Sequence, residues 1–487
     1  MKPWMRYLYI GLACALLLAG CAKEEPPTPS GSLTGPRPAS SAAESLPSDR
    51  PTITELPSHP EDHTWSSYQW TQEGNVAARR HRHIDFIATD GRIISTFTPD
   101  LSSWPNAPDE SIWGESFCDY IIGDSYVLVH FPFYGNPVLM QQGDMPTLVD
   151  AAIFDLEGNL IRLFPVGTGV GLTPIGSNDD FEASLTRRTH FYWVDSDLLA
   201  VSTGAQLWFY DMVADTLILK ADYTAEVFAG WTAMESHGYG LTEDAAWAVN
   251  GTFYYALGEG YTTDISHNPR SSLHKVTWDS DPIRISGSDY YTAFEMSGTL
   301  LFAYIIEGRI EADGGHTPLF RFWQVGEEGT LTYVDTVAHY LKPVARQTVV
   351  GYCDTHATDL AYLHVGYELR AIDLATGERH TFSPTVANGG FPADIRLIDS
   401  FSLLDIIRTD EGVRLYYTFI DTTNERRGSG DFAYYVACYD SASGQTAFAR
   451  LNTDILDVPP GDNPLGILLA IEPQSQAMQF AQLPIPN

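Results

Sequence analysis

The stretch Glu368-Leu-Arg-Ala-Ile-Asp373-Leu-Ala-Thr-Gly377-Glu-Arg-His-Thr-Phe382 decides the fold of this chain of 487 residues. It consists of an alternating apolar run, an aspartate, a short turn that contains glycine, and a second run. Alternation with a period of two predicts strands, and Asp and Gly between two such runs favour a tight turn. The stretch is therefore predicted to be a β-hairpin.

Three other segments share this form, namely residues 84–94, 152–164 and 435–448, and weaker copies lie at residues 207–219, 273–285 and 320–334. Between them lie hairpins of a second kind, in which a short polar turn joins two apolar runs: residues 120–131, 191–202, 245–257, 291–306, 349–365, 403–420 and 467–483. The two kinds alternate, and no long stretch after residue 65 has the period of an amphipathic helix.

Alternating hairpins predict a repeat of four strands. Seven repeats in about 420 residues give about 60 residues each, which fits propeller blades with long loops. Because the series opens with the first kind and closes with the second, the N-terminal and C-terminal pieces are expected to complete one blade together. We predict an all-β domain over residues 65–487: a β-propeller of seven four-stranded blades, closed by N- and C-terminal strands. An irregular sandwich and a ring of six or eight blades are the alternatives.

The stretch Ala371-Ile-Asp-Leu-Ala-Thr-Gly377 resembles the outer hairpin of quinoprotein-like and WD-type propeller repeats. The chain departs from that pattern because Phe382 stands where a tryptophan is expected, and Gly-His and Trp-Asp repeat signatures are missing. The resemblance therefore implies the fold and no catalytic residues.

The N-terminus has the features of a secretion signal. Residues 1–20 carry Lys2 and Arg6, followed by an apolar stretch. The predicted signal ends with Leu18-Ala-Gly, and Cys21 follows it. The apolar stretch is too short for a comfortable membrane span. Leu-Ala-Gly-Cys resembles the lipobox of bacterial lipoproteins, which implies cleavage before Cys21 and attachment of acyl chains to its thiol. The alternative is an ordinary secretory signal with a chance cysteine.

The resemblance implies a protein held outside the cytoplasm, on the cell surface or a periplasmic face, with the membrane as partner through the lipid on Cys21. Residues 21–64 are rich in Pro and Ser and poor in large apolar residues. Such a segment buries too little surface to offset the entropy of ordering, so we expect a disordered tether.

The charge balance is strongly acidic. The formal net charge is −34, and loss of residues 1–20 removes two positive charges and no acid, which gives −36. This charge disfavours nucleic acid and anionic headgroups as partners of the domain. Of the cysteines, Cys118, Cys353 and Cys438 remain in the domain. We expect buried free thiols, with one disulfide plus one free thiol as the alternative.

Motifs that carry chemistry are scarce. The sequence has no His-Glu-x-x-His, Cys-x-x-Cys or Gly-x-Ser-x-Gly, and its acid clusters at residues 179–182 and 279–281 lack the spacing of a calcium loop. No catalytic residue, metal or cofactor is predicted. The basic run at residues 79–83 is expected to be a solvated lead-in to the first strand, with an anion or partner site as the alternative.

A tethered propeller without a recognisable set of catalytic residues predicts a binding or scaffolding module. The alternative is an envelope glycan-active enzyme that uses loop carboxylates. The turns within hairpins are short, whereas the other connections are long and rich in aromatic residues. Such rings can bind an envelope glycan or anchor a protein, or they can pack under their own loops. The predicted ligand-binding residues are Trp104, Trp113, Phe133, Tyr134, Trp231, Tyr239 and Tyr261.

Overall fold

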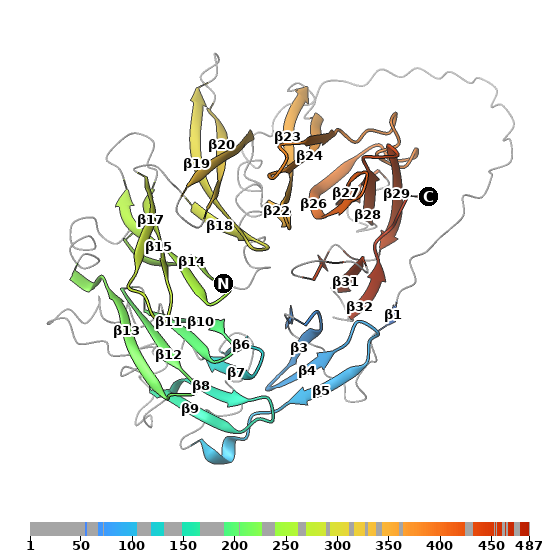
Figure 1. The fold of residues 1–487 in the computed structure, drawn as a ribbon. Coiled ribbons are helices and arrows are strands. Elements are labelled where there is room, and N and C mark those ends of the chain that lie inside the picture. The colour runs from blue at the N-terminus through green and yellow to red at the C-terminus, as the bar shows by residue number, and fades with distance from the viewer. Residues whose placement is uncertain are drawn as a thin grey trace, which may run out of the picture. The chain divides into compact units, whose positions relative to one another are not determined.

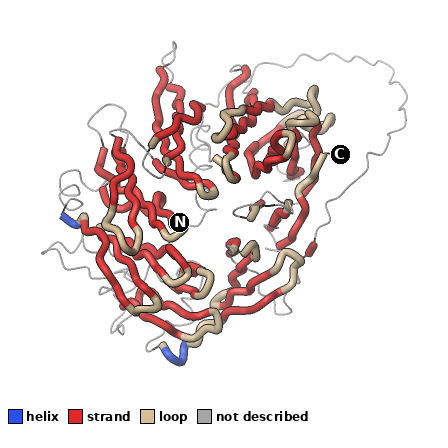
Figure 2. The backbone as a smooth tube through the Cα atoms, in the orientation of Figure 1, coloured by secondary structure: helices blue, strands red, loops and turns tan. Residues whose placement is uncertain are grey.

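A computed structural model describes residues 54–55, 67–71, 73–104, 118–130, 149–165, 189–203, 205–225, 239–261, 269–288, 293–310, 316–326, 330–337, 343–359, 364–423, 432–451, 453, 455–459, 463, 466–471 and 478–486. Strands dominate this part of the chain (Figure 2). Among these residues, no helix has the length and apolar content needed to cross a bilayer. The all-β prediction is confirmed.

The strands form eight antiparallel sheets of four strands each, which we number blades I to VIII (Figure 1). Blade I contains β2 (Ser67–Trp70), β3 (Val76–Arg80), β4 (His83–Ile87) and β5 (Ile93–Phe97). Blade II contains β6 (Asp119–Ile122), β7 (Tyr126–His130), β8 (Val149–Asp155) and β9 (Leu160–Pro165). Blade III contains β10 (Thr189–Asp195), β11 (Leu198–Thr203), β12 (Gln206–Asp211) and β13 (Thr216–Asp222).

Blades IV to VII continue in chain order. Blade IV contains β14 (Tyr239–Val249), β15 (Thr252–Tyr261), β16 (Pro269–Val276) and β17 (Ile283–Ser288). Blade V contains β18 (Ala293–Ser297), β19 (Leu300–Ile310), β20 (His316–Val325) and β21 (Leu331–Val337). Blade VI contains β22 (Val344–Arg346), β23 (Val349–Asp359), β24 (His364–Asp373) and β25 (Arg379–Phe382). Blade VII contains β26 (Ile398–Thr409), β27 (Gly412–Asp421), β28 (Ala433–Asp440) and β29 (Gln445–Leu451).

Blade VIII joins the two ends of the domain. It contains β30 (Ile455–Asp457), β31 (Ile467–Ile471), β32 (Met478–Gln482) and, as its fourth strand, β1 (Thr54–Glu55). Thr54 pairs with Phe480, and Glu55 pairs with Gln479. The prediction that N- and C-terminal strands complete one blade is confirmed, and β1 lies within the range predicted as the tether.

The predicted number of seven blades is wrong, because the first inner hairpin is hard to recognise. β2 and β3 read Ser-Tyr-Gln-Trp and Val-Ala-Ala-Arg-Arg, without the alternation that marks the other strands. These strands complete blade I, so the C-terminal hairpin belongs to a separate eighth blade. In blade VI, the three-residue β22 is the first strand, so the predicted hairpin at residues 349–365 is the pair of second and third strands.

Apolar clusters fill the spaces between successive blades. Each of the eight clusters draws its residues from two neighbouring blades, from blades I and II through to blades VII and VIII. The eighth cluster packs Val76 and Ile87 of blade I against Leu469 and Phe480 of blade VIII. The clusters therefore connect the blades in a closed cycle, which is the arrangement of a β-propeller.

The aspartates of the repeated hairpins organise their turns. The Asp373 carboxylate accepts a hydrogen bond from the backbone N–H of Ala375 at 2.9 Å, and Asp440 accepts one from Ala442 at 2.9 Å. Gly377 and Gly444 follow with φ of +74° and +69°, a conformation that glycine adopts without strain. The Asp and Gly spacing thus marks a turn in which a side chain replaces a backbone acceptor.

The three cysteines of the domain are buried and free, as expected. The basic run differs from its prediction. Arg79 and Arg80 lie in β3 with little exposure, Arg79 donates to the Cys118 carbonyl, and Arg80 lies 3.5 Å from the Asp85 carboxylate. The expectation of a solvated run is wrong for these two arginines, because the run forms the second strand of blade I and the turn that follows it.

Candidate binding surface at the ribbon end

The antiparallel order gives every blade two distinct ends. At one end lie the turns from first to second and from third to fourth strand, which we call the turn end. At the other lie the second-to-third connection and the connection to the next blade, which we call the ribbon end. Turns such as Asn250-Gly251 and Thr376-Gly377 lie at the turn end and are short.

Three of the seven predicted ligand-binding aromatics lie in the part of the chain that the structure describes. Trp104 is 3% exposed and packs against Phe154, with ring centroids 5.8 Å apart. The expectation that Trp104 is exposed is wrong, because the ring fills the cluster between blades I and II. Tyr239 begins β14, and Tyr261 ends β15, both at the ribbon end of blade IV. The other four residues, Trp113, Phe133, Tyr134 and Trp231, lie outside the described residues.

Blade V has two long paired strands at this end. The described part of its first strand begins at the pair Ala293 and Tyr304, and that of its fourth strand ends at the pair Val337 and Phe320; residues 289–292 and 338–342 lie outside the described residues. β19 and β20 continue together to the pair Ile310 and His316. We call residues 305–310 and 316–319 ribbon V, and Figure 1 shows β19 and β20 as a long pair of strands.

Blade VI has a second extension. Its first strand stops at the pair Val344 and Gly351, whereas β23 and β24 continue to the pair Asp359 and His364. We call residues 354–359 and 364–368 ribbon VI. Because blades V and VI are neighbours that share an apolar cluster, both ribbons rise from the same part of the ribbon end.

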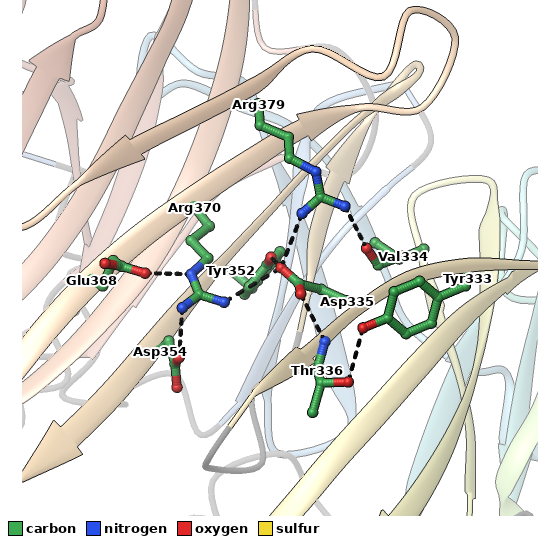
Figure 3. A network of polar contacts seen from close by, with 9 residues as sticks. All are labelled: Tyr333, Val334, Asp335, Thr336, Tyr352, Asp354, Glu368, Arg370 and Arg379. Carbon is green, nitrogen blue, oxygen red and sulfur yellow. Dashed lines mark hydrogen bonds and ion pairs between the residues drawn. The ribbon is translucent and has the colours of Figure 1, made fainter.

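An ionic network holds the base of ribbon VI (Figure 3). Asp354 and Glu368 are directly opposite each other in β23 and β24, and both contact the Arg370 guanidinium. A third nitrogen of Arg370 lies 3.4 Å from the Asp335 carboxylate in β21 of blade V. Ribbon VI is thus tied to the neighbouring blade through a guanidinium that contacts three carboxylates.

Asp335 is the centre of this network. Its carboxylate also receives a hydrogen bond from the Tyr352 hydroxyl and lies 3.3 Å from Arg379. Burial, together with the bond to Asp335, raises the pKa of Tyr352. Arg379 also donates to the Val334 carbonyl at 3.0 Å. Since the carboxylates and both arginines are engaged with one another, the network stabilises the boundary between the blades.

Aromatic residues are packed at the ribbon end of blades VI and VII. Tyr367 stacks on Phe401 with centroids 4.4 Å apart, and Phe391 of the following connection lies 6.2 Å from Phe401. The Tyr417 hydroxyl donates to the Gly390 carbonyl at 2.6 Å, which holds this connection down. Here the aromatic rings pack under a loop. The sequence analysis gave this arrangement as the alternative to ligand binding.

The sequence did not indicate the ribbons. Their strands alternate like their neighbours, and ribbon VI projects because β22 begins later and β25 ends earlier than β23 and β24. Strand length was no signal either, because β26 of blade VII, with twelve residues, is longer than β23 and β24. No group of metal-ligating side chains occurs among the described residues, and the acids at 179–182 lie outside them.

Comparisons with known proteins give a likeness of shape alone. No family model matches the chain, and no curated protein matches it. The chain is similar to the WD40 domain of SCAP from fission yeast, with a TM-score of 0.43, 8% identity, and coverage of 88% of this chain and 97% of that one. It is also similar to a chain in the structure of the mitotic checkpoint complex, with a TM-score of 0.34, 9% identity, and coverage of 94% and 99%.

The strand pairing and the closed cycle of clusters define the class: the chain is a β-propeller of eight four-stranded blades.

Proposed function

We propose that this protein is a bacterial lipoprotein whose propeller binds or scaffolds an envelope component through the ribbon end. The observation that carries the proposal is ribbon VI, because β23 and β24 stay paired beyond the ends of β22 and β25 and so extend the contact surface at this end. A rigid scaffold with elaborated connections at one end is the usual arrangement of a recognition site.

The binding role is favoured over catalysis by the state of the described acids. In the network at the ribbon end, Asp335, Asp354 and Glu368 each contact a guanidinium. None of the three is therefore an unengaged carboxylate available to a substrate, and no observation favours the glycan-active enzyme.

The anchor rests on the sequence of residues 1–21. β1 is the edge strand of blade VIII, and the predicted tether is the segment between Cys21 and β1. Its length of about 30 residues spans up to ~100 Å when fully extended.

The anchor is tested by Cys21→Ser in cells. We expect the variant to leave the membrane fraction and appear in soluble extracytoplasmic material, because an acidic domain has no other attraction to the bilayer. The measurement is fractionation followed by immunoblotting, with Cys118→Ser as the control that should stay membrane-bound. A Cys21→Ser variant that remains fully in the membrane fraction would disprove the anchor.

Binding is tested by capture with the mature chain carrying Cys21→Ser. Purified envelope glycan and detergent-solubilised envelope protein serve as separate baits, and we expect one of them to be retained at physiological salt. A variant with both ribbons replaced by two-residue turns should lose at least 90% of the capture. Failure of the unaltered chain to retain either bait would contradict the proposal.

A further inference from the structure

We propose that the ribbon end of blade VII docks a protein partner through a segment in which apolar side chains flank a carboxylate. The docking surface consists of Arg396, Leu397 and Phe432, which we call patch VII. This inference rests on the proposed function and names the class of partner.

Two large apolar side chains are exposed in patch VII. Leu397 is 57% exposed, and Phe432 is 37% exposed. Neighbouring exposed apolar side chains mark contact sites, because a partner that covers them removes their apolar area from water.

Strand register places these two side chains on one face of the sheet. At the ribbon end, β26 and β28 both pair with Asp421 of β27. The next residue, Thr422, donates its N–H to the Leu397 carbonyl at 3.1 Å, and Phe432 directly precedes β28. The register, continued by one position, therefore aligns Leu397, Thr422 and Phe432 in one row. Opposite residues share a face, so Leu397 and Phe432 lie on the same face with Cα atoms about 10 Å apart.

The backbone of patch VII is held in place from both sides. The Thr423 hydroxyl oxygen accepts hydrogen bonds from the N–H groups of Arg396 and Leu397, at 2.7 and 3.1 Å. Earlier in the same connection, Phe391 and Ile395 are buried in the cluster between blades VI and VII. A backbone held in this way loses little conformational entropy on binding, which favours affinity.

The polar groups of this connection are already used within it. The Asn388 side chain accepts from the N–H groups of Thr385 and Gly390 and donates to the Ser383 carbonyl. The Thr423 hydroxyl oxygen accepts the two bonds described above. Burying the hydroxyl groups of a glycan against apolar side chains, without hydrogen bonds, costs free energy. Patch VII therefore fits a protein partner better than a glycan.

Arg396 indicates the charge of the partner. Its side chain is exposed, and no hydrogen bond or ion pair engages its guanidinium among the residues that the structure describes. A carboxylate beside the apolar side chains of the partner can pair with this guanidinium through two parallel hydrogen bonds. Two copies of this chain repel each other, since each has a formal net charge of −34. Charge thus favours a different protein that presents an acid within an apolar segment.

The test uses the mature chain with Cys21→Ser and a fluorescent heptapeptide. In this peptide a central glutamate lies between two leucines, and serines fill the other positions. Anisotropy should show saturable binding at physiological salt, with a dissociation constant in roughly the 0.1 mM range. Replacing both leucines by serine should weaken binding about tenfold or more, because the apolar contact is lost. Absence of binding to the unaltered peptide would overturn the inference.

Three variants locate the site. Leu397→Ser and Phe432→Ser should each weaken binding about fivefold or more. Arg396→Glu should weaken it by a similar factor, and a peptide with lysine in place of the glutamate should restore binding to within about twofold, because the charges are exchanged. Val213→Ser is the matched control, since Val213 is 79% exposed at the turn end, and it should leave binding unchanged. Thermal unfolding of each variant shows that the propeller remains folded.

Unchanged binding to Leu397→Ser or to Arg396→Glu would overturn the inference. Capture of purified envelope glycan that is lost in Leu397→Ser would assign patch VII to a glycan, and a dimer that dissociates in Leu397→Ser would assign it to a second copy. Either result overturns the inference. If Leu397→Ser captures an envelope bait as well as the unaltered chain does, the proposed function stands and this inference alone falls. If the unaltered chain retains no bait, the proposed function itself fails.

Discussion

At the scale of single residues, the buried histidine of blade II contributes to the response of the propeller to acid. His130 is buried at the end of β7, edge-on to Phe191, with ring centroids 5.0 Å apart. Burial lowers the pKa of His130 to about 3 from its usual 6.5. The folded state therefore favours the neutral form of His130.

This predicts a loss of stability between pH 6.5 and pH 4. The unfolded chain takes up a proton below pH 6.5 while the folded chain does not, so the free energy of unfolding decreases as the pH falls toward 3. At pH 5 the single group accounts for about 2 kcal/mol relative to pH 8. His130→Phe should flatten this part of the curve in urea unfolding, whereas the exposed His81→Phe should not. Curves of equal slope for parent and His130→Phe would disprove it.

The residues that organise turns were the ones best predicted from sequence. Asp373 and Gly377 act within a few positions of each other, so their spacing alone specifies the turn. Trp104 could not be placed in this way, because its burial depends on Phe154 of the next blade. Long-range packing of this kind leaves no local pattern in the sequence.

At the scale of elements, the contact between β21 and ribbon VI is expected to contribute to the free energy of unfolding. Asp335→Ala removes the common acceptor of Arg370, Arg379 and Tyr352. We expect it to lower the free energy of unfolding by about 1–3 kcal/mol, because partly buried donors lose their partner. Urea unfolding measures the change.

A nearby exposed residue is the control for this prediction. Glu378, with a side chain 65% exposed, lies 3.4 Å from His380, and Glu378→Gln should change the stability by less than about 0.5 kcal/mol. A loss for Asp335→Ala no larger than that of the control would show that the network does not hold the blade boundary.

The hairpins show how far the sequence predicts elements. All seven predicted hairpins of the first kind are the third and fourth strands of a blade. Those with both Asp and Gly in the turn, such as residues 368–382, carry a local signal that marks them. The strands that were missed, β1, β2, β3, β22 and β30, have two to five residues. These segments are strands because they pair with a neighbouring strand. Their own sequences are too short to show the alternation that predicts a strand.

At the scale of the whole molecule, closure depends on the C-terminal hairpin. Deleting residues 465–487 removes β31 and β32, which leaves β1 without its neighbour. It also exposes Val76 and Ile87 of blade I and Leu451 of blade VII, since these residues pack against the deleted strands. We expect aggregation and a loss of cooperative unfolding, measured by light scattering and calorimetry. A truncated chain as soluble and cooperative as the parent would contradict closure through blade VIII.

The sequence predicted the architecture and the distinction between two ends, because repetition and turn length are local properties summed over the chain. It did not predict ribbon VI, since this arises where β22 begins later and β25 ends earlier than the paired strands β23 and β24. Of the predicted aromatic residues, Tyr239 and Tyr261 lie in strands at the ribbon end and stay a prediction as ligand-binding residues, whereas Trp104 belongs to the core.

The central claim is that the ribbon end is the binding end. The most direct measurement is amide hydrogen exchange of the mature chain, alone and saturated with the envelope component that it captures. The account predicts slower exchange in ribbon VI, residues 354–359 and 364–368, with the turn end at Asn250-Gly251 and Thr376-Gly377 unchanged. Slower exchange at those turns, with both ribbons unaffected, would contradict it.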